Sequence, residues 1–297
     1  MDLTFFAQVI VSGLATGAVY ALVGMGYTVV FSSTRIFNLA QGQALMLGIM
    51  FTWQLRQDWG WPTPIAIVTA AVAAAAVNVL VERVAVAPLR PNRNFNVLLA
   101  TLVTTIGAST VIGGLAVVVW GVNAKPFSPY FGARGLDVGG VTITAQQVLM
   151  VGMALLIAFA YHLFATRTRW GTALVAMSDD PEAAALRGVP VSRARMLAFG
   201  LAGLISALGG IVIAPVVFAD PNVGLDFGLK GFVAIAVGGF GSMSGAVAGG
   251  MVLGVSEAVT ANYWNDQYRP LAGLFLVLVI LLIRPQGLLG RQRVREV

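Results

Sequence analysis

Cysteine is absent from this sequence of 297 residues, and histidine occurs only once. Without cysteine the chain forms no disulfide and no thiolate metal site, and the single His162 is too little for the usual histidine-based nucleophilic or zinc centres. No glycine is followed by lysine, so the phosphate-binding loop of ATPases is missing as well. These absences predict a chain that is not an enzyme and that uses no metal or cofactor of its own.

Charge is also scarce, at 10% of residues against about 25% in soluble globular domains. Hydrophobic residues make up 58% of the chain, and the mean hydropathy is +0.86. The formal net charge of +6 comes from arginines scattered between apolar runs rather than gathered on one face, which argues against a nucleic-acid partner. The composition therefore predicts a protein that crosses a lipid membrane several times.

Several stretches are long and apolar enough to cross a bilayer, which takes about 20 residues. Residues 1–32 lack a basic start and are too long for a signal peptide, so the first stretch is expected to be a retained span. We predict an all-α polytopic membrane protein with about eight transmembrane helices, forming one domain over residues 1–297. The candidate stretches are 5–32, 36–55, 62–82, 96–120, 145–165, 195–219, 227–260 and 269–284.

The positions of arginine and lysine orient these spans, because cytoplasmic loops are enriched in both. If the Arg-rich loop 166–195 is cytoplasmic, the positive side chains fall mostly inside, and the N-terminus lies outside while the C-terminus lies inside. The inside set is Arg35, Arg83, Arg90, Arg93, Arg167, Arg169, Arg187, Arg193, Arg195, Arg284, Arg291, Arg293 and Arg295. The outside set is Arg56, Lys125, Arg134, Lys230 and Arg269.

One stretch cannot be a single helix in this topology. Residues 227–260 must enter the membrane and return to the same side, and the motif GGFGSMSG at 238–245 frees the backbone for a turn. This predicts a broken or re-entrant helix near 227–245, whose free carbonyls and Ser242 and Ser244 would line a substrate pathway, as broken helices do in transporters. The alternative is a tight hairpin between two tilted spans.

Polar side chains within spans are costly in hydrocarbon and therefore point to function. They gather at the start of the second span, where Asn38, Gln41 and Gln43 either line the substrate pathway or form hydrogen bonds between helices. Glu257 is the only carboxylate within a predicted span. It is expected to pair with an outer cation or to lie at an interface, with a proton relay as a further alternative.

Glycines spaced four residues apart let helix backbones approach closely. Such pairs occur in the first span, at Gly13 and Gly17, and near the end of the glycine-rich stretch, at Gly250 and Gly254. They are expected to contact another helix, either in this chain or in a second subunit.

The polar loop 166–195 carries the signals of a short helix in the run DDPEAAALRG. Asp179 or Asp180 suits the N-cap, Pro181 suits the first helical position, and Gly188 suits the stop. An isolated helix this short is marginal in water. We expect it to dock on a soluble cytoplasmic partner; the alternative is a solvated loop that contains a helical turn.

Three ordered motifs span the chain: GLATGAVYALVGMGYTVVFSSTRIFNLAQGQALMLG at 13–48, DDPEAAALRGVPVSRARMLAFGLAGLISALGGIVIAP at 179–215 and GLKGFVAIAVGGFGSMSGAVAGG at 228–250. Together they resemble the permeases of branched-chain amino-acid ABC importers, of the LivH type, over essentially the whole sequence. The resemblance implies a permease subunit in the bacterial inner membrane. It also implies three kinds of partner: a LivM-type permease, two cytoplasmic ATPases and a periplasmic substrate-binding protein.

In that family the loop containing Asp-Pro-Glu-Ala is the coupling helix that meets the ATPase. The resemblance maps this role onto Asp180, Pro181, Glu182, Ala183, Ala184 and Arg187. We expect a close-packed ATPase contact at Ala184, so that a bulky replacement there would block association.

The resemblance indicates the transported solute less firmly than it indicates an ABC importer. Relatives carry leucine, isoleucine and valine, while others are associated with urea, short amides or aromatic acids. The expected cargo is a branched-chain or other hydrophobic amino acid, or a related small amide. The alternative function is an autonomous channel or ion-coupled secondary transporter for a small polar solute, which is disfavoured because Glu257 alone offers a membrane-embedded charge for coupling.

Overall fold

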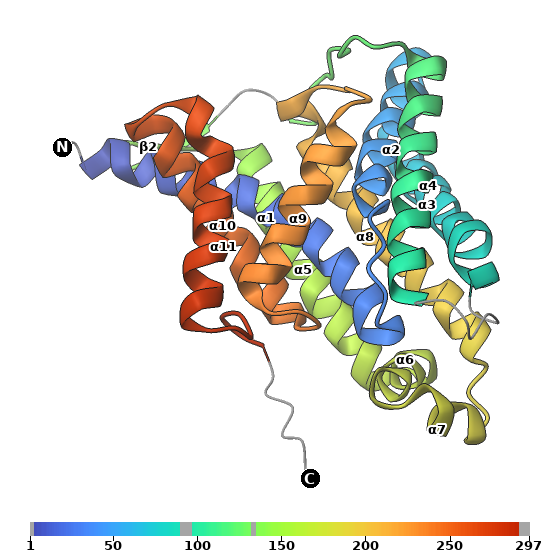
Figure 1. Ribbon diagram of the computed structural model, residues 1–297. Helices are drawn as coiled ribbons and strands as arrows, with labels where there is room; N and C mark the ends of the chain where they lie inside the picture. Colours follow the sequence, from blue (N-terminus) through green and yellow to red (C-terminus); the bar gives the residue numbers. More distant parts are fainter. Residues whose placement is uncertain (1–2, 90–96, 132–134, 291–297) are drawn as a thin grey trace.

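The computed structural model describes residues 3–89, 97–131 and 135–290 (Figure 1). Within these residues, seven helices are long and apolar enough to cross a membrane, which confirms the polytopic all-α class. They are α1 (Leu3–Thr34), α3 (Thr63–Val81) with the turns that continue it to Leu89, α4 (Val97–Trp120), α5 (Ala145–Arg167), α8 (Val191–Val217), α10 (Met243–Tyr263) and α11 (Arg269–Ile283) with the turn that precedes it from Asp266. Six arginines used above to orient the spans lie outside the described residues: Arg90, Arg93, Arg134, Arg291, Arg293 and Arg295.

Shorter elements connect these helices. Two of them lie within the bundle, two form the polar loop, and one hairpin of strands closes against the start of α1 through paired hydrogen bonds between Gln8 and Thr142. They are α2 (Gln41–Trp53) with a π-helical turn at Gln54–Asp58, α9 (Val223–Gly238), α6 (Arg169–Asp179), α7 (Pro181–Leu186), β1 (Gly135–Val138) and β2 (Val141–Thr144). The end of α3 continues as a π-helical turn at Glu82–Val86 and a 3₁₀ turn at Ala87–Leu89, and another 3₁₀ turn, Asp266–Tyr268, precedes α11.

The core lies around α1 and α8. Over their most apolar windows these helices are 56% and 67% buried, whereas α11 is 6% buried and so presents most of its surface outward. Glycine makes the tight contacts: a Cβ added to Gly17 would lie 2.6 Å from the Gly250 carbonyl oxygen, and one added to Gly13 would lie 2.8 Å from the Val255 Cα. The partner of the first glycine pair is therefore α10 of the same chain.

The helices form two units of the same order that run in opposite directions. In contacts, α1 corresponds to α8, α2 to α9, α3 to α10 and α4 to α11: α2 and α3 pack on α8, while α9 and α10 pack on α1. At the end of the bundle that carries α6 and α7, α1 ends and α8 begins (Figure 1). Such inverted repeats are common in transporters, whose substrate sites lie where the repeats meet.

One predicted span is shorter in the structure, and another is broken as expected. Residues 36–40 of the expected second span are not helical, and α2 starts at Gln41, part-way along α4 and α8 (Figure 1). The preceding helix stops because Arg35 takes a left-handed backbone conformation, with φ 58°. The break expected within 227–260 is confirmed, since α9 ends at Gly238 and α10 starts at Met243.

Candidate translocation site and coupling segment

The two short helices of the bundle meet at glycine. At 1.5 Å per residue, the 13 residues of α2 and the 16 of α9 span about 20 and 24 Å, less than the roughly 30 Å of hydrocarbon. A Cβ added to Gly42 would lie 1.9 Å from the Gly224 carbonyl oxygen and 2.6 Å from the Gly228 Cα. The start of α2 therefore touches the backbone of α9 where the two units meet.

The amides at the start of α2 belong to a buried hydrogen-bond network. The Asn38 amide nitrogen donates to the Asn78 amide oxygen at 2.9 Å and to the Gln41 amide oxygen at 3.4 Å. The Gln41 amide nitrogen in turn donates to the Ala202 carbonyl and the Ser206 hydroxyl, both at 2.7 Å. Asn38 and Gln41 have no exposed surface. Of the two readings left open by the sequence, this geometry supports hydrogen bonding between helices.

Gln43 lies differently from its neighbours, between α4 and α9. Its amide nitrogen donates to the Ser109 hydroxyl at 3.1 Å, and its amide oxygen has no hydrogen-bond partner among the described residues although it is buried. A Cβ on Gly224 would lie 2.5 Å from that oxygen. Gln43 is thus a polar group with spare hydrogen-bonding capacity against the short helix α9.

The carbonyls at the end of α9 are not free. Leu288 and Leu289, which follow α11, donate their backbone N–H groups to the carbonyls of Val237 and Gly238, each at 2.9 Å. Within the break expected to offer free carbonyls, that of Gly238 therefore already accepts a hydrogen bond, while a pathway role for the rest of the break stays a prediction. The C-terminal segment supplies the donors that a helix end needs, and no periodic pattern in the sequence predicted this contact.

The two serines of the break differ in exposure and in role. The Ser242 hydroxyl accepts a hydrogen bond from the Gly245 N–H at 3.0 Å and so caps α10. Ser244 is exposed, and its hydroxyl lies 3.3 Å from that of Ser242. The structure brings these serines together with each other, at the end of α9 remote from Gly224 (Figure 1).

Four phenylalanines form an aromatic cluster beside the break. Phe31 lies in the last turn of α1, Phe37 lies in the non-helical segment before α2, Phe232 lies on α9, and Phe240 lies in the break. The ring of Phe37 stacks on Phe31 at a centroid distance of 4.5 Å and meets Phe232 and Phe240 edge-on at 5.5 and 5.4 Å. Four separate segments are therefore tied by one set of rings, which the sequence reading did not single out.

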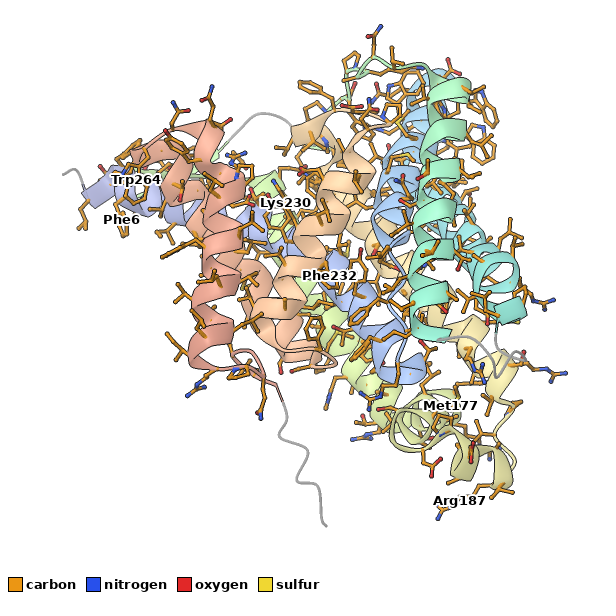
Figure 2. All side chains as sticks on the ribbon, in the orientation of Figure 1. Phe6, Met177, Arg187, Lys230, Phe232 and Trp264 are labelled. Atoms are coloured by element: carbon orange, nitrogen blue, oxygen red, sulfur yellow. The ribbon has the colours of Figure 1, made fainter. Side chains whose placement is uncertain are left out.

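A charge cluster joins α9 to α1 and α10. The Lys230 ammonium nitrogen lies 3.3 Å from the Glu257 carboxylate and 3.5 Å from that of Asp226, and the Tyr20 hydroxyl donates to Glu257 at 2.8 Å. Of the alternatives left open for Glu257, the structure shows a pair with an outer cation. That cation is on the helix α9 (Figure 2) rather than in a loop. The sequence placed Lys230 on the outer side but did not identify it as the partner of Glu257.

The segment that the sequence predicts to couple to an ATPase, called the coupling segment below, consists of α6 and α7 at the far end of the bundle. The Asp180 carboxylate accepts hydrogen bonds from the backbone N–H groups of Glu182 and Ala183 at 2.9 and 3.0 Å, which confirms Asp180 as the N-cap of α7. Pro181 is the first residue of the helix, and Gly188 follows it in a left-handed conformation, as the sequence predicted.

The exposed face of α7 is not the expected one. Ala184 is 3% exposed and belongs to the core of this chain, so its methyl group is not available to a partner. Leu186 is 90% exposed, and Arg187 points away from the bundle (Figure 2). The outward face of α7 is therefore formed by Leu186 and Arg187 rather than by Ala184. Its signal in the sequence was an isolated leucine in a polar loop.

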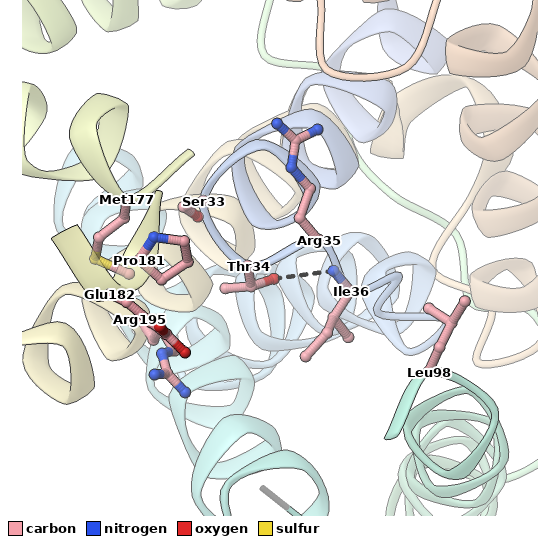
Figure 3. A pocket seen from close by; sticks show the side chains of 9 residues that line it. All are labelled: Ser33, Thr34, Arg35, Ile36, Leu98, Met177, Pro181, Glu182 and Arg195. Carbon is pink, nitrogen blue, oxygen red and sulfur yellow. Dashed lines mark hydrogen bonds between the residues drawn. The ribbon is translucent and has the colours of Figure 1, made fainter. Parts of the chain in front are cut away.

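A cavity of about 570 Å³ separates the coupling segment from the end of α1 (Figure 3). Ser33 to Ile36 line one side, Pro181 and Glu182 line another, and Arg195 of α8 lies close to Glu182 in the view. The described residues contain no group of three or more histidine, cysteine or acidic side chains able to hold a metal ion.

Comparison with known proteins gives full-length matches. The family described as branched-chain amino acid transport system / permease component matches residues 9–284. The high-affinity branched-chain amino acid transport system permease protein BraD of Pseudomonas aeruginosa is 30% identical, over 100% of this chain and 99% of that protein. LivH of Escherichia coli, which carries the same description, is 29% identical over 99% of this chain and 98% of that protein.

Among solved structures, a chain of PsaBC from Streptococcus pneumoniae in complex with Fab shares the fold. Its TM-score is 0.51 at 14% sequence identity, covering 96% of this chain and 94% of that one. An inverted pair of helical units, a capped helix at one end and these matches define a transmembrane permease subunit of an ABC importer, a multi-pass protein of the inner membrane. The chain belongs to the family of branched-chain amino acid transport system permease components.

Proposed function

We propose that this permease carries branched-chain or other hydrophobic amino acids, or related small amides, into the cell. The support is the 30% identity to BraD, over 100% of this chain and 99% of that protein. In this proposal the cargo arrives on a periplasmic binding protein, a second permease of the LivM type completes the passage, and two cytoplasmic ATPases supply the energy. The N-terminus is periplasmic, and the C-terminus, α6 and α7 are cytoplasmic.

The passage is proposed to run along α9. Gln43 offers a free amide oxygen, the aromatic cluster offers an apolar wall, and Ser242 and Ser244 offer hydroxyls at the inner end. Such a wall suits a solute with an apolar side chain and a few polar groups. Asn38 and Gln41 are proposed to support this passage without lining it, because their hydrogen-bond network holds the start of α2 in place.

The coupling role is proposed for α7. Asp180, Pro181, Glu182 and Ala183 shape the helix, Ala184 anchors it in this chain, and Leu186 and Arg187 meet the ATPase. A six-residue helix would be marginal alone, so its cap and its buried alanine keep Leu186 in place. An autonomous or ion-coupled transporter fits less well, since Glu257, the carboxylate within the span, is already paired with Lys230.

The test is reconstitution of the chain with its ATPases, second permease and binding protein in proteoliposomes. Uptake of leucine that requires both ATP and the binding protein is the expected result. Uptake driven by an ion gradient without ATP would support the alternative and contradict the proposal.

The docking surface is tested separately. Leu186→Asp is expected to lower co-purification of the ATPase by about tenfold, because a buried charge replaces an apolar anchor, while yield of the permease stays constant. Leu136→Asp is the matched control, since Leu136 is exposed on β1 at the opposite end of the bundle. Equal co-purification of both variants would remove Leu186 from the interface.

A further inference from the structure

Resting on the proposed function, we propose that Arg35 is a positioning residue that passes movement of the coupling segment to the aromatic cluster and so to the end of α9. Four features carry the inference. They are the contacts of Arg35, the composition of the cluster, the backbone of the break, and the cavity beside α7.

Arg35 connects α1 to the coupling segment directly. One terminal nitrogen of its guanidinium group donates to the Ser178 carbonyl at 2.8 Å. Ser178 lies in the last turn of α6, two residues before Asp180, which caps α7. A displacement of α7 by the ATPase therefore acts on the carbonyl that holds the arginine.

The same guanidinium group lies against the aromatic cluster. Its central carbon is 5.7 Å from the ring centroid of Phe31, within the range of a cation–π contact. Phe31 stacks on Phe37, and the Phe240 ring centroid is 5.9 Å from that of Phe31. The contacts thus run without a gap from α6 to the break.

The far end of this series has a backbone that can turn. Phe240 lies between Gly239 and Gly241, whose φ angles are +111° and +79°. Residues with side chains rarely adopt these angles, so glycine leaves the ring of Phe240 on a short, permissive hinge. Phe232 and Phe240 also meet each other, at 5.8 Å, so a shift of the hinge reaches the body of α9.

The cavity gives the coupling segment room to move. It lies between α7 and the end of α1, with Pro181 and Glu182 on one side and Thr34 and Ile36 on the other (Figure 3). A close-packed contact would resist displacement, whereas this cavity leaves space beside Pro181 and Glu182. Packing is thus loose beside the coupling segment and tight within the aromatic cluster.

The backbone conformation of Arg35 allows a variant that loses only the side chain. At φ 58° a non-glycine residue is strained, and glycine adopts this conformation freely. Arg35→Gly therefore removes the side chain without asking the backbone to change. Arg35→Lys keeps the charge and one hydrogen bond, and Arg284→Ala removes an exposed arginine from the same side of the membrane.

The experiment measures leucine uptake and ATP hydrolysis on the same reconstituted complexes. Arg35→Gly is expected to assemble with wild-type yield and to hydrolyse ATP, but to import about fivefold less leucine per ATP. Arg35→Lys should recover most of the loss, and Arg284→Ala should match the wild type. A wild-type ratio in Arg35→Gly, or a loss explained entirely by poorer assembly, would overturn the inference. Absence of ATP-dependent uptake in the wild type would instead overturn the proposed function.

Discussion

The short helices α2 and α9 hold corresponding places in the two units, yet they are fixed by different forces. α2 is held by neutral amides whose network reaches α3 and α8. α9 is held by the charge cluster around Lys230 and by the aromatic cluster, and its last carbonyls bind the C-terminal segment, whereas glycine contacts are common to both helices. Directional hydrogen bonds fix one geometry, whereas rings and ion pairs tolerate small shifts. We therefore interpret α2 as the fixed wall and α9 as the element that moves.

The largest effect is expected where the two helices touch. Gly42→Val places a side chain 1.9 Å from a carbonyl oxygen of α9, which should cost more than about 3 kcal/mol because backbone must shift. We expect loss of folded protein, measured as monodisperse yield in detergent. Gly107→Val on α4 is the control, because no atom lies within 4 Å of the added Cβ. Normal yield of Gly42→Val would contradict the close contact of α2 and α9.

Breaking the charge cluster should have the next largest effect. Lys230→Met leaves the buried carboxylate of Glu257 without its cation, which we expect to destabilise the protein by about 3 kcal/mol. The double variant Lys230→Met with Glu257→Gln should recover much of this loss, since neither charge then remains. Thermal unfolding in detergent measures both. If the double variant is as unstable as the single one, the ion pair is not what holds α9.

The amide network should respond more weakly and in another way. Gln41→Leu removes a donor to two partners on α8, at a cost of about 2 kcal/mol. We expect lower thermal stability with little change in uptake per assembled complex. Gln267→Leu, at an exposed position, serves as the control. A selective loss of uptake with unchanged stability would place Gln41 in the passage itself.

The smallest effect is expected at the break. Ser242→Ala removes the cap of α10, worth about 1 kcal/mol. Ser244→Ala, whose hydroxyl caps no helix in the structure, should leave stability unchanged. Comparing the unfolding temperatures of the two variants checks this difference, and equal values would mean that the cap contributes nothing.

Most of the fold was predictable because it depends on local signals. Apolar length located the spans, the motif at 238–245 located the break, and Asp180 with Pro181 and Gly188 located α7. The start of α2 was placed five residues too early, because an apolar run does not reveal the left-handed turn at Arg35.

The candidate site was less predictable, because its contacts join residues far apart in the chain. Asn38 and Asn78 are separated by 40 positions, so composition alone left hydrogen bonding and substrate contact equally open. Lys230 and Glu257 come from different helices, and each looked isolated in the sequence. The exposure of Leu186 depends on how α7 packs, which places Ala184 inward and the leucine outward.

The attachment of the C-terminal segment to α9 can be followed by amide hydrogen exchange. The amide protons of Leu288 and Leu289 are engaged by the carbonyls of Val237 and Gly238. Such protons exchange with deuterated water when local opening breaks the bonds. Mass spectrometry of deuterium uptake in the peptide that contains both leucines would therefore report how readily the end of α9 separates from the C-terminal segment. The measurement needs no attached label and can be made at rest and during turnover.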